Sequence, residues 1–120
     1  MTRPLVVKVT CGAGDPERCN QGFTVAATAL AAGAEVSLWL TGEAAWFGVP
    51  GRAEEFGLPL ATPLVDLLEA VLAEGRVTVC SQCAARREIG AEDLRAGVRI
   101  AGAAAFTEEI LRPEAQALVY

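Results

Sequence analysis

The alternation of short apolar runs with longer, helix-length segments constrains the fold of this chain more than any other feature. Five runs of five to seven residues have the composition of β-strands: residues 5–10, 35–41, 76–80, 97–101 and 116–120. The segments between them predict helices at residues 15–33, 62–75, 81–88 and 103–111, with a further helix beginning at Gly90. Strands that alternate with helices form parallel βαβ units. We therefore predict an α/β fold with three layers, α/β/α, around a mostly parallel five-stranded sheet.

Length and composition fit one domain, residues 1–120, with a hydrophobic core. Of the 120 residues, 52% are hydrophobic and 21% charged, so the chain has enough apolar surface to fold. Ten basic and fifteen acidic residues give a net charge of −5, which argues against nucleic acid or an anionic membrane as the main partner. The sequence contains no histidine, which excludes Ser-His-Asp hydrolysis, Cys-His proteolysis and histidine metal sites. The four cysteines are therefore the first candidates for chemistry.

The start of the chain predicts a cytoplasmic protein. The apolar stretch at residues 5–9 is interrupted by Lys8 and is shorter than the core of a secretory signal, about 7–15 residues. No segment approaches the ~20 apolar residues of a membrane-spanning helix. In a reducing compartment, cysteines bind metals, react or pack in the core more often than they form structural disulfides.

Cys80 and Cys83 form a Cys-x-x-Cys motif directly after a predicted strand and at the start of a predicted helix. Unpaired N–H groups and the positive end of the dipole at a helix N-terminus stabilise a thiolate, the nucleophilic form of cysteine. Arg86 and Arg87 follow closely and add positive potential. In parallel sheets, ligands and chemistry gather at the carboxyl ends of the strands. Together these features favour a functional Cys80 over a buried packing residue.

Three kinds of chemistry suit this motif. Thioredoxin-like exchange uses Cys-x-x-Cys between a strand and a helix, but it also needs a later proline-led strand facing the motif, and only Pro113 follows here. A four-cysteine zinc site needs two close pairs, whereas seven residues separate Cys11 from Cys19. Cys19 falls inside a predicted helix and is expected to pack in the core. A carrier that passes on sulfane sulfur as a persulfide needs only one activated, reachable cysteine. We therefore predict neither a metal nor a cofactor.

Two further segments carry weaker signals. Residues 42–61 are rich in glycine, proline and aromatic residues, which predicts a long loop with one short helix. Trp46 and Phe47 in this loop are expected either to cover the cysteine, to contact another subunit, or to pack in the core. The acidic pair Glu108 and Glu109 is expected on a solvated helix face.

The residues around Cys80 resemble the central motif of the DsrE/DsrF-like family of sulfur-relay proteins. In that motif, a strand of the form apolar-x-apolar-Cys runs into a helix of small residues, followed by Arg-Arg and an apolar residue. The corresponding stretch here is RVTVCSQCAARREIGAEDL, residues 76–94. The opening VVKVTCGAGDPERC, the segment EVSLWLTGEAAW and the terminal ALVY are similar to the first, second and last strands of the family with their loops.

The resemblance implies a DsrE-like fold, assembly into a homo-oligomer (a trimer or a hexamer), and Cys80 as the residue that carries a persulfide. Such a sulfurtransferase or sulfur carrier takes its sulfur from a donor protein and gives it to an acceptor protein. Glu88 stands where the family has glycine, which predicts an altered turn. Cys83 is an additional thiol, either a resolving partner of Cys80 or a packing residue. Two alternatives stay open: a non-catalytic oligomeric module of the same fold that binds a small ligand or a protein, and a thiol-disulfide redox protein that uses Cys80 and Cys83.

Overall fold

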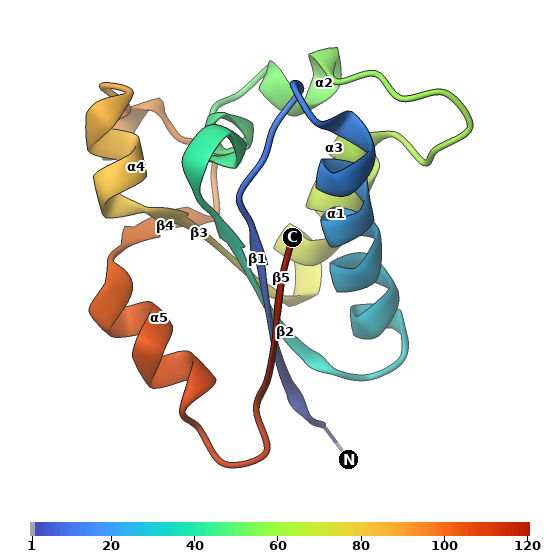
Figure 1. Cartoon of the computed structure of the whole chain (residues 1–120), viewed down its shortest axis with the longest axis vertical. Helices are drawn as coiled ribbons and strands as arrows, with labels where there is room; N and C mark the ends of the chain where they lie inside the picture. The colour runs from blue at the N-terminus through green and yellow to red at the C-terminus, as the bar shows by residue number, and fades with distance from the viewer. Residues whose placement is uncertain (1) are drawn as a thin grey trace.

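The computed structural model describes residues 2–120 and contains a sheet of five parallel strands (Figure 1). The strands are β1 (Pro4–Val9), β2 (Glu35–Leu40), β3 (Arg76–Cys80), β4 (Val98–Ala101) and β5 (Gln116–Val119). Their order across the sheet is β4-β3-β2-β1-β5, so the chain moves outward from β1 to β4 and then returns to the other side of β1. The predicted five-stranded α/β fold is confirmed, with a sheet that is wholly parallel.

Helices lie on both faces of this sheet (Figure 1). They are α1 (Pro16–Ala31), the 3₁₀ helix η1 (Gly42–Gly48), α2 (Arg52–Glu55), α3 (Leu64–Glu74), α4 (Ser81–Arg86), the 3₁₀ helix η2 (Ala91–Asp93) and α5 (Ala103–Ile110). The helices α1 and α3 pack side by side on one face, and α5 lies on the other. Two local predictions were wrong: the segment from Gly90 makes only the short turn η2, and the 42–61 segment contains two short helices in place of one.

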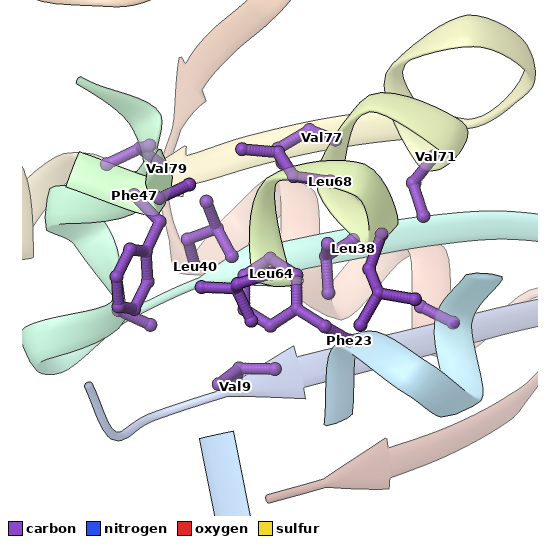
Figure 2. Packing of buried hydrophobic residues seen from close by; sticks show 14 of the residues in the cluster. Val9, Phe23, Leu38, Leu40, Phe47, Leu64, Leu68, Val71, Val77 and Val79 are labelled. Carbon is purple, nitrogen blue, oxygen red and sulfur yellow. The ribbon is translucent and has the colours of Figure 1, made fainter. Parts of the chain in front are cut away.

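The face under α1 and α3, here called the core face, is aliphatic. Alternate residues of the strands point toward these helices and are buried: Val7, Val9, Leu38, Leu40, Val77 and Val79. Phe23 of α1, Phe47 of η1 and Leu68 of α3 fill the space above them (Figure 2). Burying each such side chain contributes about 1.5–3 kcal/mol. The core face therefore supplies most of the apolar burial in the molecule.

The opposite face, here called the α5 face, is more polar and is covered by one helix. Its middle row consists of Lys8, Trp39, Thr78 and Arg99, which are neighbours across β1, β2, β3 and β4. The ring of Phe106 on α5 packs edge-on against Trp39, with 5.3 Å between the ring centroids. The side chain of Trp39 is thereby buried, whereas Lys8 and Arg99 are half-buried.

Glu109 is buried, so the expectation that the Glu108–Glu109 pair faces solvent is wrong for this residue. Glu108 is exposed, but Glu109 is only 8% exposed because α5 turns it toward the sheet. Its carboxylate accepts hydrogen bonds from Ser37 Oγ at 2.5 Å, Trp39 Nε1 at 3.0 Å and the guanidinium of Arg99 at 2.6 Å. A buried charge needs such partners to replace water, and these three hold α5 against β2 and β4.

Candidate functional site

Cys80 is the last residue of β3 and directly precedes α4, as the sequence predicts. It lies two residues beyond Thr78 on the same strand, so its side chain belongs to the α5 face. The N-termini of α4 and α5 lie close together here. A Cβ added to Gly102, just before α5, would lie only 3.0 Å from Oγ of Ser81, the first residue of α4. Cys80 is half-buried at the carboxyl edge of the sheet, where α/β proteins build their sites.

Cys83 lies one turn into α4 and faces the start of η1. Its Sγ accepts a hydrogen bond from the backbone N–H of Gly42 at 3.1 Å, and its side chain packs against the core cluster. Gly42 has φ +53°, and a Cβ at this position would lie 2.5 Å from the carbonyl oxygen of Thr10. Only glycine suits this backbone, so the close approach of η1 to Cys83 depends on Gly42.

Arg87 joins α4 to η1 and does not serve as a free cation for Cys80. Its guanidinium donates hydrogen bonds to the Glu43 carboxylate at 2.8 and 3.0 Å and to the Cys83 carbonyl oxygen at 3.1 Å. Arg86 is exposed on α4. These two arginines therefore do not supply the positive potential at Cys80 that the sequence predicts. That charge comes from another residue.

The pKa of the Cys80 thiol lies below the ordinary value of a cysteine. Burial raises this pKa, but the backbone N–H and thiol of Cys83, the backbone N–H of Gln82 and the charge of Lys8 together lower it further than burial raises it. Donors and a cation beside a sulfur favour its thiolate. Lys8 is not among the residues that the sequence predicts to act on Cys80. The available signal was a single lysine inside an otherwise apolar strand, LVVKV, where a charged side chain needs a reason.

Cys11 and Cys19 lie apart from this pair. Cys19 is fully buried in α1, as predicted, and burial, with smaller contributions from Cys11 and Asp15, raises its pKa to about 12. Burial and the carboxylate of Asp15 also raise the pKa of Cys11. In residues 2–120, no three Cys, Asp or Glu side chains gather where they would hold a metal ion. Cys11 therefore groups with Cys19, and Cys80 with Cys83.

The aromatic pair after β2 does not cover Cys80. Phe47 is buried on the core face, where its ring meets the rings of Phe23 and Phe56 at 5.9 and 5.7 Å. Trp46 is half-buried and stacks under the Arg52 guanidinium, 4.1 Å from the ring centroid. Of the three roles expected for the pair, core packing describes Phe47.

The turn after α4 is strained at Glu88. This residue has φ +56°, in the left-handed region that favours glycine. The neighbouring Ile89 is buried and its N–H donates to the Ala84 carbonyl oxygen at 2.9 Å, so the turn is fixed by packing.

Across residues 2–120, no helix combines the length and apolar character that crossing a membrane requires.

These features define a class: small parallel α/β proteins with a cysteine of lowered pKa where a strand meets a short helix. The model of the DsrE/DsrF-like family matches residues 5–117, so the chain belongs to this family. The family inferred from the residues around Cys80 is thereby confirmed.

Two known proteins are similar to this chain. The uncharacterized protein MJ0760 of Methanocaldococcus jannaschii is 28% identical over 110 residues, which are 91% of this chain and 40% of that protein. This chain thus spans about two fifths of the length of that relative. The crystal structure of the YchN protein from E. coli is similar with a TM-score of 0.83 and 18% identity, over 99% of this chain and all of that one. At this identity the likeness concerns the fold.

Proposed function

We propose that this protein carries sulfane sulfur as a persulfide on Cys80 and passes it to a partner protein, as a sulfur carrier or sulfurtransferase. The observation that carries the proposal is the half-buried Cys80 thiol with a lowered pKa, at a strand end in a DsrE/DsrF-like chain. A relay needs an anionic sulfur both when it accepts its cargo and when it releases it. Because such a thiol must stay reduced, we assign the reaction to the cytoplasm.

The proposed relay consists of two balanced exchanges. In loading, the Cys80 thiolate attacks the outer sulfur of a donor persulfide, R–S–SH; the donor S–S bond breaks, Cys80–S–SH forms, and R–S⁻ leaves. In unloading, an acceptor thiolate, R′–S⁻, attacks the outer sulfur of the Cys80 persulfide. The acceptor becomes R′–S–SH, and the electron pair of the broken S–S bond returns to Cys80 Sγ. Neither exchange needs an added oxidant, reductant or metal.

Mass spectrometry of the intact protein tests the loading step. After incubation with glutathione persulfide, the wild-type chain should gain about 32 Da, the mass of one sulfur atom. Cys80→Ser should gain nothing, and Cys11→Ser, the matched control at another half-buried thiol, should gain as much as wild type. Cyanide added to the loaded protein should then remove the extra sulfur as thiocyanate. A Cys80→Ser variant that loads like wild type would show that the sulfur goes elsewhere.

The short separation of Cys80 and Cys83 favours the thiol-disulfide redox alternative enough to test it. The Cys83 thiol lies beside Cys80, so it can attack the inner sulfur of a Cys80 persulfide, which forms a Cys80–Cys83 disulfide and releases HS⁻. Redox titration should then give a reversible disulfide with a potential between about −270 and −120 mV, as in redox enzymes. If Cys83 is a packing residue, as its contacts with Gly42 and the core suggest, Cys83→Ser should hold the persulfide no longer than wild type.

We further propose that copies of the chain assemble, as a trimer or a hexamer, and that the edge of the sheet at β5 is one of the contact surfaces. Leu118 and Val119 on this strand, and Leu111 at the end of the preceding helix α5, are exposed large apolar side chains. The edge strand, QALV, also carries no charge or proline that would block a second strand. Light scattering should show an oligomer for wild type and a smaller species for Val119→Lys. A monomeric wild-type chain would contradict this arrangement.

A further inference from the structure

Lys8 is the single lysine of the chain and lies inside a strand of the sheet. It sits between the buried Val7 and Val9 on β1, and its side chain points to the opposite side, the α5 face. Cys80 lies on the same face, two strands across the sheet from Lys8 and one step beyond Thr78 along β3. The stem of Lys8 reaches α5 at Phe106, and this helix begins beside Cys80. The N–H of Phe106 donates to the carbonyl oxygen of Gly102, and the preceding residue, Ala101, pairs with Cys80 across the sheet.

The ammonium group of Lys8 is held by an aromatic ring and not by a carboxylate. Its Nζ lies 5.0 Å from the centroid of the Phe106 ring on α5, which is the geometry of a cation–π contact. In the part of the chain that the structure describes, Lys8 takes part in no ion pair, whereas Arg99 on the same row is paired with Glu109 at 2.6 Å. A half-buried cation without a carboxylate is expected to have another anion nearby.

The groups around Cys80 leave its sulfur as that anion. Cys83 approaches Cys80 from α4 and the charge of Lys8 acts on it from β1, whereas Arg99 of β4 turns to Thr78 and Glu109, at 2.7 and 2.6 Å. The charge of Glu109 is taken up by Arg99 and by Arg76, at 2.6 and 3.5 Å. Lys8 is then the cation left to act on Cys80, and its charge lowers the pKa of that thiol.

We propose that Lys8 balances the negative charge of the Cys80 sulfur, both as thiolate and as persulfide anion, and that Phe106 positions the ammonium group for this task. The inference rests on the proposed function for its persulfide part. In unloading, the S–S bond breaks and its electron pair stays on Cys80 Sγ, so a fixed cation at this place favours the leaving thiolate. Lys8 thus acts on the sulfur from a strand far from the Cys-x-x-Cys motif in the sequence, and Phe106 is the positioning residue.

The rate of Cys80 alkylation as a function of pH tests the inference without any sulfur donor. Iodoacetamide labelling is followed by peptide mass mapping, so that Cys80 is scored apart from the other three thiols. Lys8→Met should move the midpoint of the pH profile upward and slow labelling at neutral pH about three- to tenfold, because fewer molecules carry the thiolate. Lys8→Arg should restore most of the wild-type profile. Phe106→Leu should shift the midpoint in the same direction as Lys8→Met, but less.

Arg86→Met is the matched control, because it removes a cation that is exposed on α4, three residues beyond Cys83. Its midpoint should equal that of wild type. Equal midpoints for folded Lys8→Met and wild type, with folding checked by circular dichroism, would overturn the inference. A shifted midpoint in a chain that never gains sulfur from glutathione persulfide would instead keep the Lys8 assignment and reject the sulfur-carrier function.

Discussion

The two faces of the sheet use different physical means to hold their helices. On the core face, aliphatic side chains from the strands meet α1 and α3 without polar partners (Figure 2). On the α5 face, a single helix is held by the carboxylate of Glu109 and the rings of Phe106 and Trp39. The core face tolerates no charge, whereas the α5 face already contains cations, and a thiolate there costs less. This difference between the faces explains why the thiol pKa is raised at Cys19 and lowered at Cys80.

The largest expected effect is the difference in reactivity between these two cysteines. Cys19 has no exposed surface and a pKa of about 12, so it should react only when α1 comes away from the core. With a stability of about 5 kcal/mol or more, its labelling by iodoacetamide should be at least about a thousandfold slower than that of Cys80. Peptide mass mapping over time measures both rates in one sample. Similar rates for the two cysteines would show that the faces do not differ in this way.

The second effect is the loss of a large side chain from the core face. Leu38 is fully buried in the middle of β2, and Leu38→Ala removes its packing and leaves a cavity. The expected loss of unfolding free energy is about 2–5 kcal/mol, measured by urea denaturation. Leu60→Ala, the same substitution at a fully exposed position, is the control and should change stability by less than about 0.5 kcal/mol. A small loss for Leu38→Ala would mean that the core face is loosely packed.

The third effect concerns the polar anchor of α5. Glu109→Ala leaves the donors of Ser37, Trp39 and Arg99 without their acceptor and should cost about 2–3 kcal/mol in urea denaturation. Ser37→Ala is the milder control, because it removes one donor and keeps the carboxylate with its other partners. An equal cost for both variants would show that the carboxylate adds little beyond its bond to Ser37.

The same carboxylate makes stability depend on pH. Burial raises the pKa of Glu109, but Ser37, Trp39 and the two arginines lower it further, so the folded-state pKa lies below the ordinary value. Its contribution is therefore complete above the unfolded pKa, about 4.3, and is lost as pH falls through the lowered folded-state pKa. The stability difference between wild type and Glu109→Gln should shrink on acidification from neutral pH. A difference that stays constant down to pH of about 3 would mean that Glu109 is not the titrating group.

The sequence predicts the core face far better than the α5 face, for a physical reason. The alternation of apolar residues shows which face of a strand is buried, and the helix-length segments separate one strand from the next. Together they predict all five strands and the location of Cys80 at a strand end. Contacts such as Lys8 with Phe106, or Glu109 with Arg99, join residues from separate elements and depend on strand order and register. Arg87 looked like the cation for Cys80 because it is near in sequence, yet its bond to Glu43 is set by how η1 packs on α4. The polar exceptions inside apolar patterns, Lys8 above all, were the signal to follow.

The smallest expected effect is a gain in stability near Cys80. Glu88 has φ +56°, and a side chain in the left-handed region costs about 1–2 kcal/mol relative to glycine. Glycine also loses more chain entropy on folding, by about 0.5–1 kcal/mol, so Glu88→Gly should raise the unfolding free energy by about 0.5–1 kcal/mol. Glu88→Ala keeps a Cβ and should gain nothing. Because Ile89 anchors this turn in the core, relief of the backbone strain at Glu88 should leave the rate of Cys80 alkylation unchanged. A faster or slower rate would instead show that the strained turn helps to set the position of α4, and with it the thiol pair.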